Sequence, residues 1–271
     1  KVFSEHEIDI AFFSAGGSVS EKFAKFAADS GAVVIDNTSH FRMDKDIPLV
    51  VPECNPSDIA MWKNRGIIAN PNCSTIQMVQ ILKPLDDAYG INRVDVATYQ
   101  AASGGGARHM REVLGQFRDL GNEVSAELND PAAAILEIDR KVLAKQRSGE
   151  LDTAQFGVPL SGSLIPWIDS DLGNGQSREE WKSDAETNKI LGLEGDDRVM
   201  MDGLCVRIAA MRSHSQALTM KLTEDLPVAE IERIIAEDNQ WAQVVPNTKD
   251  ATMEGLTPVA ASGSLNIPVG R

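Results

Sequence analysis

Three short apolar runs stand out in the first seventy residues: "IDIAFFSA" (8–15), "AVVID" (32–36) and "GIIA" (66–69). Runs that are apolar almost without interruption are typical of strands buried on both faces. Between the first two, "SVSEKFAKFAADSG" places apolar residues at helical spacing and ends at Gly31, which is a common helix stop. This strand–helix–strand order predicts a right-handed βαβ unit and a parallel sheet.

A longer helix is expected after Cys73, in "STIQMVQILKPLDDAYG", which Pro84 should kink or shorten and Gly90 should end. The alternating segment 93–103 then predicts a strand. The residues expected on one face of that strand are Val94, Val96, Thr98 and Gln100.

The middle of the chain reads as helices and loops. A Gly-rich turn, "GGGARH", leads into an amphipathic helix, and a second helix is expected over 130–146. In this second helix Asp130 would be the N-cap and Pro131 the first helical residue. Residues 147–176 are rich in Gly, Ser and Pro and predict a loop with one strand at most.

The last hundred residues add a helix with a capping-box pattern, Ser177 followed by Glu180. The strands "LCVRIAAMR" and "SQALTMKLTE" follow on either side of Ser213 and His214, and "PVAEIERIIAEDN" is an amphipathic helix. The pattern therefore predicts an α/β protein. A partial Rossmann-like parallel sheet comes first and an α+β part follows, with the boundary near Cys73.

Composition narrows the possible functions. The 271 residues carry a net charge of −14, from 26 basic and 40 acidic residues, and no Lys/Arg-rich block is present. Such a chain repels nucleic acid and anionic membranes, and no apolar run approaches the ~18 residues of a membrane span. Three widely spaced cysteines without a CxxC pair predict neither zinc site nor disulfide, so we expect no metal and a cytoplasmic location.

Cys73 is the first candidate for chemistry. It follows "IIANPN", a strand and turn, at a helix start, where unpaired N–H groups favour a thiolate and so lower the thiol pKa. An inert, buried cysteine fits the local pattern equally well. His214 is a candidate base near Arg207, but their separation of seven residues requires a bulge or a turn before both can face one pocket.

Seven motifs in order resemble one family. They are "FSAGGSVS", "DNTSHFRM", "PLVVPECNP", "IANPNCSTIQMV", "TYQAASGGG", "EEWKSDAETNKIL" and "VRIAAMRSHSQA". Together they resemble aspartate-β-semialdehyde dehydrogenase of the bacterial type, from residue 8 to the final "LNIPVGR". By this resemblance, residues 1–72 are the remainder of a dinucleotide-binding domain and residues 73–271 are a catalytic and dimerisation domain.

The resemblance also implies roles for individual residues. Cys73 would be the nucleophile that forms an acyl-thioester, His214 the general acid/base, and Gln100 the residue that orients the substrate. The implied substrate-binding residues are Arg207, Glu179 and Asn72, and the implied phosphate-binding residues are Arg42 and Lys182. The implied cofactor-binding residues are Ser14, Ala15, Gly16, Gly17, Ser103 and Gly104.

The implied reaction is the NADP-dependent, reversible reductive dephosphorylation of L-aspartyl-4-phosphate to L-aspartate 4-semialdehyde, with a small-molecule substrate and inorganic phosphate as partners. It belongs to lysine, methionine, threonine and diaminopimelate biosynthesis, and the family implies a homodimer. The chain has no initiator Met, no Gly-rich phosphate turn after a first strand and no final helix after "IPVGR", so we expect a fragment.

Three alternatives stay open at this point. An N-acetyl-glutamyl-phosphate reductase-like enzyme would perform the same chemistry on a longer acyl phosphate. Cys73 and His214 could instead form a hydrolytic pair without a cofactor, although cationic positions such as Arg42 and Lys182 argue against this. A truncated chain could also dimerise without being active.

Overall fold

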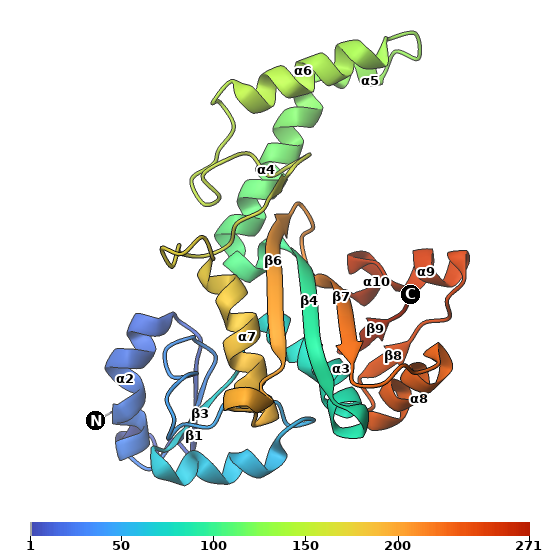
Figure 1. Ribbon diagram of the computed structural model, residues 1–271. Coiled ribbons are helices and arrows are strands. Elements are labelled where there is room, and N and C mark those ends of the chain that lie inside the picture. The colour runs from blue at the N-terminus through green and yellow to red at the C-terminus, as the bar shows by residue number, and fades with distance from the viewer. Residues whose placement is uncertain (1) are drawn as a thin grey trace.

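A parallel sheet forms the first part of the computed structural model, which describes residues 2–271 (Figure 1). Its strands lie in the order β1 (Ile10–Phe13), β2 (Val33–Asp36) and β3 (Ile67–Ala69). Both neighbouring pairs are parallel, and helix α2 (Gly17–Asp29) makes the crossover between β1 and β2. The predicted βαβ unit is therefore confirmed. The other elements of this part are α1 (Val2–Glu5) and the 3-10 helix η1 (Pro56–Asn64).

Burial of β1 differs from the prediction. Ala11 and Phe13 are buried in the core beneath α2, but Ile10 and Phe12 on the other face are 54% and 77% exposed. No element of the described chain covers that face of β1, and β1 pairs only with β2. The expectation of a strand buried on both faces is wrong here, because an apolar run alone does not reveal whether both faces have a neighbour.

A mixed sheet forms the centre of the molecule. Its order is β5 (Leu164–Ile165), β6 (Met200–Ile208), β4 (Ile91–Gln100) and β7 (Ser215–Leu222). β4 is parallel to β6 and antiparallel to β7. The four β4 residues predicted to share a face are all buried, which confirms the alternation: Val94, Val96, Thr98 and Gln100.

Two helices, α3 (Cys73–Tyr89) and α7 (Arg178–Leu191), pack against that buried face. Helix α3 continues through Pro84 and ends at Gly90, so the prediction that the proline shortens the helix is wrong. Leu82 and Leu85, on either side of the proline, are fully buried in the core with β4. This packing stabilises the helical conformation on both sides of Pro84.

The capping box of α7 is present as predicted. The Ser177 hydroxyl accepts a hydrogen bond from the Glu180 backbone N–H, and the Glu180 carboxylate accepts one from the Ser177 N–H at 2.8 Å. Because both groups are buried, the start of α7 is fixed in position, and with it Glu179, which bonds with Asn72 and Gln100.

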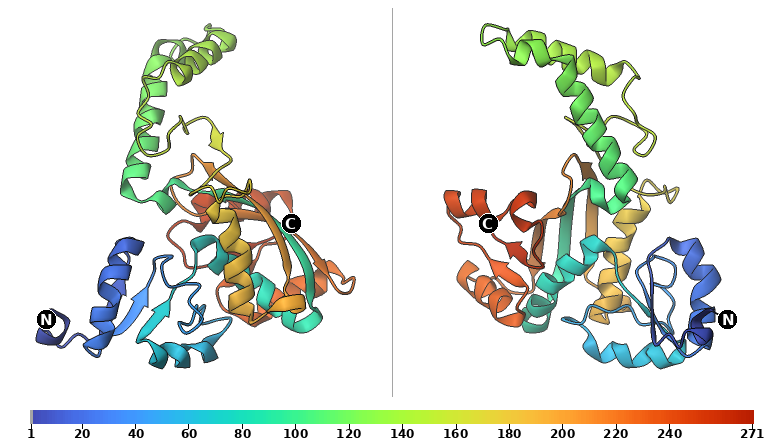
Figure 2. Two further views of the ribbon diagram at one scale, coloured as in Figure 1. Left: turned by 60° about the vertical axis from the view of Figure 1, so that its left-hand side comes forward. Right: turned by 180° about the vertical axis from the view of Figure 1, so that it is seen from behind.

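A helical arm projects from the central sheet (Figures 1 and 2). It contains α4 (Ala107–Glu123), α5 (Ser125–Leu128) and α6 (Ile135–Arg147). The predicted start of the last helix at Asp130 is wrong. The Asp130 carboxylate instead accepts a hydrogen bond from the Ala132 N–H, so it caps a turn and the helix begins only at Ile135.

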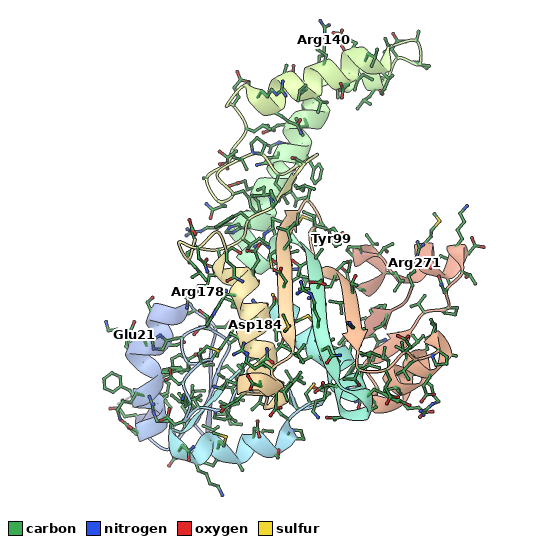
Figure 3. The ribbon with its side chains drawn as sticks, viewed as in Figure 1. Glu21, Tyr99, Arg140, Arg178, Asp184 and Arg271 are labelled. Carbon is green, nitrogen blue, oxygen red and sulfur yellow. The ribbon has the colours of Figure 1, made fainter. Side chains whose placement is uncertain are left out.

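The C-terminal segment packs beside β7 and α3 (Figure 2). Its elements are α8 (Val228–Asp238), β8 (Ala242–Val244), α9 (Lys249–Gly255), α10 (Pro258–Ala261) and β9 (Ile267–Val269). No element of the described residues covers the outer face of the central sheet, and Tyr99 on that face is 41% exposed (Figure 3). Within residues 2–271, no helix has the length and apolar character that crossing a membrane requires.

Candidate active site

Cys73 is the first residue of α3, and three residues separate it from the end of β3 at Ala69. Asn72 is the N-cap, and its side-chain oxygen accepts a hydrogen bond from the Ser74 N–H at 2.9 Å. The prediction of a cysteine at a helix start is therefore confirmed. The carboxyl end of a parallel strand is where open α/β sheets place their ligands.

A cleft of about 580 Å³ opens between the parallel sheet and the central sheet, with Cys73 in its wall. The strands β4 and β6, the helices α3 and α7 and the 3-10 helix η2 (Ala102–Gly105) contribute to it. The predicted site residues that line it are Cys73, His214, Gln100, Arg207, Glu179, Asn72, Arg42, Lys182, Ser103 and Gly104. Residues as far apart in the sequence as Arg42 and His214 thus line the cleft that contains the Cys73 thiol.

The Cys73 thiol is exposed to solvent, yet its pKa is raised from the ordinary value. Burial of the surrounding site has the largest effect, and the Glu179 carboxylate adds to it. The Ser74 N–H, Arg42 and Arg207 favour the thiolate but are outweighed. The helix-start N–H of Ser74 therefore acts in the expected direction, but burial and Glu179 outweigh it, so the net shift of the thiol pKa is opposite to the expectation.

His214 reaches the cleft because of a tight turn between β6 and β7. Ser213 adopts a left-handed conformation with φ of 68°, which turns the chain just before His214. This turn lets His214 and Arg207 line one pocket, and it is the turn that their separation of seven residues was expected to need. The Nδ1 atom of His214 accepts a hydrogen bond from the Ala101 N–H at 2.9 Å. Burial and the Arg207 guanidinium lower the pKa of His214 to about 4, against the smaller opposing effect of Glu179.

Arg207 is fixed by the same backbone residue. Its Nη1 donates to the Ala101 carbonyl oxygen at 2.7 Å, and burial lowers its pKa. Gly104 lies directly against both side chains. A β-carbon at Gly104 would be 3.0 Å from Nη1 of Arg207 and 3.2 Å from Nε2 of His214. A glycine therefore allows the η2 segment to approach the two side chains closely.

Glu179 organises the opposite wall of the cleft. Its Oε1 accepts hydrogen bonds from the Asn72 and Gln100 side chains at 2.9 and 3.0 Å, and its Oε2 pairs with Lys182 at 2.9 Å. Burial alone would raise the Glu179 pKa, but Lys182 and the two amides outweigh it, so the pKa is lowered. Lys182 also pairs with Asp169 at 2.7 Å. The side-chain oxygen of Gln100 is buried and has no hydrogen-bond partner among residues 2–271.

Glu186 is a site residue that the sequence interpretation missed. It is 1% exposed, and its carboxylate accepts hydrogen bonds from the Asn72 backbone N–H at 2.6 Å and from Arg42 at 3.0 Å. Burial raises its pKa despite the nearby Arg42. The signal was its spacing of seven from Glu179, which places both on one face of α7. Lys189, three residues further on, donates to three backbone carbonyls of the 42–47 segment.

The predicted cofactor loop, 14–17, lies outside this cleft, at the carboxyl end of β1. It is linked to the cleft through Asn37, whose side chain donates to the Ser14 hydroxyl at 3.1 Å. The side-chain oxygen of Asn37 accepts a hydrogen bond from the side-chain amide of Asn70 at 2.8 Å. Gly16 has φ of 100°, and a β-carbon there would meet nothing within 4 Å. Together these contacts place an open turn at the start of α2 next to the segment that carries Cys73.

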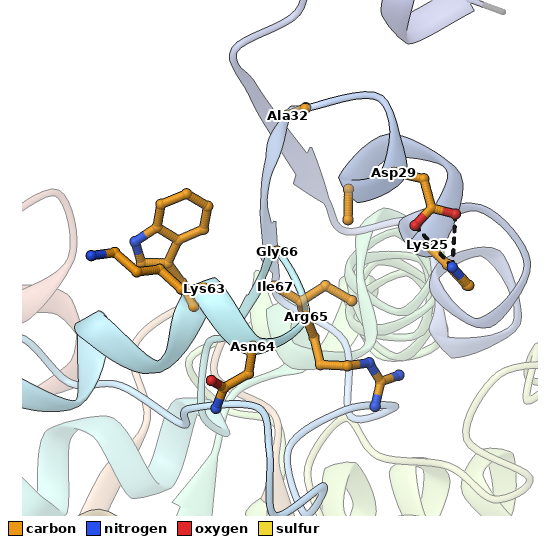
Figure 4. Close-up of a pocket in the computed structure, with 11 residues that line it drawn as sticks. Lys25, Asp29, Ala32, Lys63, Asn64, Arg65, Gly66 and Ile67 are labelled. Carbon is orange, nitrogen blue, oxygen red and sulfur yellow. Dashed lines mark hydrogen bonds and ion pairs between the residues drawn. The ribbon is translucent and has the colours of Figure 1, made fainter.

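A second cavity, of about 460 Å³, lies at the amino ends of β2 and β3, away from Cys73 (Figure 4). Gly66 and Ile67 form part of its wall, and the ammonium of Lys25 beside it is paired with Asp29. In residues 2–271 no group of His, Cys, Asp and Glu side chains is arranged to hold a metal ion.

The fold and the cleft define a class: a two-part α/β protein with a helix-start thiol between three cationic side chains, Arg42, Lys182 and Arg207. Family models agree with this architecture. A model described as "Semialdehyde dehydrogenase, dimerisation domain" matches residues 82–271, and one described as "Semialdehyde dehydrogenase, NAD binding domain" matches residues 1–62. The chain belongs to the semialdehyde dehydrogenase family.

Individual relatives point to the same branch of this family. The chain is 50% identical over 234 residues to an aspartate-semialdehyde dehydrogenase of Campylobacter jejuni; the match covers 86% of this chain and 60% of that protein. Aspartate semialdehyde dehydrogenase II of Vibrio cholerae is similar with a TM-score of 0.80 and 36% identity, covering 99% of this chain and 70% of that one. The aspartate semialdehyde dehydrogenase of Francisella tularensis is similar with a TM-score of 0.88 and 32% identity. The match covers 100% of this chain and 74% of that one.

These findings confirm the predicted resemblance and the predicted fold class. The chain spans about 60% of the length of the Campylobacter jejuni relative. The domain boundary at residue 73 and the roles of the individual site residues stay predictions.

Proposed function

We propose that this protein catalyses the reversible, NADP-dependent conversion of L-aspartyl-4-phosphate to L-aspartate 4-semialdehyde through a thioester on Cys73. One observation supports this proposal most strongly: the exposed Cys73 and three cationic side chains line one cleft of a strongly acidic protein. The three cationic residues are Arg42, Lys182 and Arg207. A Vibrio cholerae relative, 37% identical, has been crystallised with ASA, which supports the same substrate class here.

The charges of the cleft match the proposed substrate. Arg207 offers a planar guanidinium for the α-carboxylate, and Arg42 and Lys182 offer charge for the phosphate. Glu179 provides a carboxylate for the substrate ammonium group. Lys182 is paired with Glu179 and Asp169, so binding of phosphate would exchange these partners.

In the phosphorylating direction, the Cys73 thiolate attacks the aldehyde carbon, and a carbon–sulfur bond forms as the carbonyl electrons move to oxygen. A bound nicotinamide would accept the hydride from that carbon. Inorganic phosphate, held by Arg42 and Lys182, then attacks the thioester carbon. The carbon–sulfur bond breaks, and the Cys73 thiolate is regenerated. Two easier steps replace one difficult step, which is the advantage of covalent catalysis.

We propose that the cofactor is NADP, held by the 14–17 turn and by Ser103 and Gly104. The fit rests on the open turn at Gly16, on the first N–H groups of α2, which no side chain caps, and on the hydrogen-bonded link through Asn37 to the Cys73 segment. A helix start with free N–H groups suits an anionic ligand. Ser103 and Gly104 line the same cleft as Cys73, and Gly104 lies against His214, so these two residues would hold the nicotinamide on the side of the cleft where His214 lies.

We also propose that the protein is a cytoplasmic homodimer. All three cysteines are free, which fits a reducing compartment. The family model for residues 82–271 is that of a dimerisation domain, and the outer face of the central sheet, which includes the half-exposed Tyr99 and Leu204, has no cover within the described chain.

An assay of phosphate-dependent NADP reduction with L-aspartate 4-semialdehyde tests the proposal, with Cys73→Ala as the comparison and Cys205→Ala, a buried cysteine, as the control. We expect activity that requires phosphate, is lost in Cys73→Ala and is kept in Cys205→Ala. Activity with N-acetyl-glutamate semialdehyde instead would favour the alternative substrate. Hydrolysis without NADP would identify a cofactor-free cysteine enzyme, and no activity would favour a dimerising fragment.

A further inference from the structure

Helix α7 lies between the parallel sheet and the central sheet, and one of its faces carries four charged side chains (Figures 1 and 2). Glu179, Lys182, Glu186 and Lys189 follow one another at intervals of three, four and three residues, which places them on one face of the helix. The first two line the cleft. The other two lie closer to the carboxyl end of α7 and bind the part of the chain that contains Arg42.

The ammonium group of Lys189 is bonded to three backbone carbonyl oxygens of the turn 42–47. It donates to the carbonyl oxygens of Arg42 and Asp44 at 2.7 Å and to that of Ile47 at 3.0 Å. A carbonyl oxygen can only accept, so these bonds use all three N–H groups that a protonated lysine has. Lys189 therefore holds this turn at three points and has no N–H group left for a ligand.

Arg42 is the residue of this turn that lines the cleft, and α7 holds both its backbone and its side chain. Lys189 binds its carbonyl oxygen, and Glu186 accepts a hydrogen bond from its Nη1 at 3.0 Å. The side chain is 7% exposed, yet its Nε atom is buried without a hydrogen-bond partner among residues 2–271. A buried donor without a partner is unfavourable, so a ligand that supplies an acceptor fits this guanidinium.

The geometry of α7 relates Arg42 to Lys182, the second cationic residue proposed to bind phosphate. Lys182 and Lys189 are seven residues apart, which is about two helical turns and about 10 Å along the helix axis. Lys182 belongs to the helix itself, whereas Arg42 comes from the part of the chain that forms the parallel sheet. The distance between the two cationic groups therefore depends on how firmly the turn 42–47 is attached to α7.

We propose that Lys189 is a positioning residue for anion binding. By attaching the turn 42–47 to α7, it holds the Arg42 guanidinium where Arg42 and Lys182 bind one inorganic phosphate together. The Lys189 ammonium does not itself touch the phosphate. Two cationic groups that are already in place bind an anion more tightly than two that must first be ordered. This inference rests on the proposed function, which assigns phosphate to Arg42 and Lys182.

The Lys189→Met variant tests this role, because methionine keeps an unbranched side chain and removes the three N–H groups. The half-saturating concentration of inorganic phosphate is measured from its effect on the rate of Cys73 alkylation, a readout that needs no turnover. We expect this concentration to rise about tenfold, which is the effect of losing one charge-assisted hydrogen bond between Arg42 and phosphate. An unchanged value in the folded variant would overturn the proposal.

Steady-state kinetics adds a readout that a merely structural role would not move. In Lys189→Met the KM for phosphate should rise as the half-saturating concentration does, whereas the KM for L-aspartate 4-semialdehyde should stay unchanged. The reason is that Lys189 is bonded to the turn that carries Arg42 and not to Arg207, the residue proposed for the substrate carboxylate. Equal rises in both KM values would show a general distortion of the cleft and contradict the specific role.

Arg65→Met is the matched control, because Arg65 binds the same turn without connecting it to α7. Its guanidinium pairs with the carboxylates of Asp44 and Asp46, at 4.0 and 3.0 Å, and all three side chains are exposed. We expect this variant to keep the wild-type half-saturating concentration of phosphate. A rise as large as that in Lys189→Met would count against the proposal, because loosening of the turn would then be sufficient without loss of the attachment to α7.

A double-mutant cycle identifies the residue through which Lys189 acts. In an Arg42→Met background, Lys189→Met should change the half-saturating phosphate concentration no further, because the guanidinium that Lys189 positions is gone. A second rise of similar size would show that Lys189 does not act through Arg42, and the proposal would be wrong.

Failure to fold and failure of the proposed function lead to different results. If Lys189→Met does not fold, Lys189→Arg replaces it: the charge is kept, but a planar guanidinium cannot direct three N–H groups from one nitrogen to three carbonyl oxygens. The half-saturating concentration should then still rise, and a wild-type value would refute the role of Lys189. Absence of any phosphate effect on the wild-type protein would contradict the proposed function and this inference together, whereas a wild-type effect that Lys189→Met leaves unchanged contradicts this inference alone.

Discussion

The buried carboxylate of Glu186 accepts a 2.6 Å hydrogen bond from the backbone N–H of Asn72, the residue that precedes Cys73. Glu186 lies on α7, in the second part of the chain, whereas Asn72 ends the segment that leaves the parallel sheet. The same carboxylate pairs with Arg42. One side chain therefore connects the segment that carries Cys73, the proposed phosphate-binding residue Arg42 and the helix that carries Glu179 and Lys182.

Replacing Glu186 should destabilise the protein strongly. Glu186→Ala leaves the Arg42 guanidinium and the Asn72 N–H buried without this partner, and breaking a buried pair costs about 3–5 kcal/mol. Glu186→Gln keeps an acceptor for the N–H and should lose less. Free energies of unfolding from urea titrations check this.

The matched control for Glu186 is Asp184→Ala on the same helix (Figure 3). Asp184 pairs with Arg198, which is exposed, and the amide of its second partner, Asn188, keeps two backbone acceptors in the variant. Surface pairs contribute about 0–1 kcal/mol, so this variant should stay close to the wild type. If Glu186→Ala is no less stable than Asp184→Ala, the carboxylate does not connect the two parts of the site as described.

Cys73 should be the one cysteine that alkylating reagents modify in the folded protein. Cys54 and Cys205 are buried, and burial raises the pKa of each to about 12, so neither offers a thiolate. The Cys73 pKa is also raised, so its rate of alkylation should still increase above the pH at which an ordinary cysteine is half ionised.

Mass spectrometry after timed iodoacetamide treatment measures the three rates of alkylation. Inorganic phosphate should slow the reaction of Cys73, because an anion at Arg42 reduces the positive charge that favours the thiolate. Chloride at equal ionic strength is the control for screening. A rate at Cys73 that levels off near neutral pH would show that its pKa is lowered and not raised.

The sequence was informative wherever the structure depends on neighbours along the chain. The βαβ order, the alternation in β4 and the Ser177–Glu180 capping box all rest on local spacing, and all three are present. The predicted helix start at Asp130 was wrong, because the same local pattern allows two structures. An aspartate can cap a helix or a turn with the same side-chain oxygen, and only the path of the following residues decides which.

The sequence predicted which residues line the candidate site, but it did not predict the direction of the Cys73 pKa or the contacts of Glu186. Motif order brought Cys73, His214 and Arg207 into one hypothesis, and all three line one cleft. The direction of the Cys73 pKa depends on how densely the site is packed and on where Glu179 lies, and Glu186 matters only because Asn72 and Arg42 converge on it. Such contacts between distant segments leave no periodic signal in a single sequence.

Gly104→Ala should impair the site without unfolding the protein. The added β-carbon would lie about 3 Å from the ends of Arg207 and His214, so these side chains must move to accommodate it. We expect a fall in kcat/KM of about 10²-fold, since displacement of positioning groups by about 1 Å costs that much. Steady-state kinetics and thermal unfolding, measured together, check both parts of the prediction.

Gly115→Ala is the control for Gly104→Ala. Gly115 lies inside α4, and a β-carbon there would meet nothing within 4 Å. Alanine in a helix interior is favoured over glycine by about 1 kcal/mol, so this variant should be more stable than the wild type with unchanged kinetics. Equal kinetics in both variants would mean that the η2 segment does not constrain Arg207 and His214.

The stability of the folded protein should fall between pH 6.5 and pH 4 because of His214. Its pKa of about 4 in the folded state is below the ordinary value of 6.5, so in this window the unfolded chain binds a proton that the folded chain does not. Acid therefore favours unfolding, by up to about 3 kcal/mol at pH 4. Nearby Glu179 and Asp169, whose pKa values are lowered, add losses at more acidic pH, whereas the raised pKa of Glu186 acts in the opposite direction.

Comparison with His214→Gln isolates the contribution of the imidazole, because the carboxylates are common to both proteins. Urea titrations at pH 7.0, 5.5 and 4.5, at constant ionic strength, should give a smaller loss of unfolding free energy in the variant than in the wild type. The difference between the two proteins in this loss should grow as the pH falls. The reason is that, down to the folded-state pKa of His214, the folded protein binds fewer protons at this residue than the unfolded chain does. Parallel stability curves for the two proteins would show that His214 ionises as freely in the cleft as in the unfolded chain, and would remove the electrostatic support for a neutral imidazole beside Arg207.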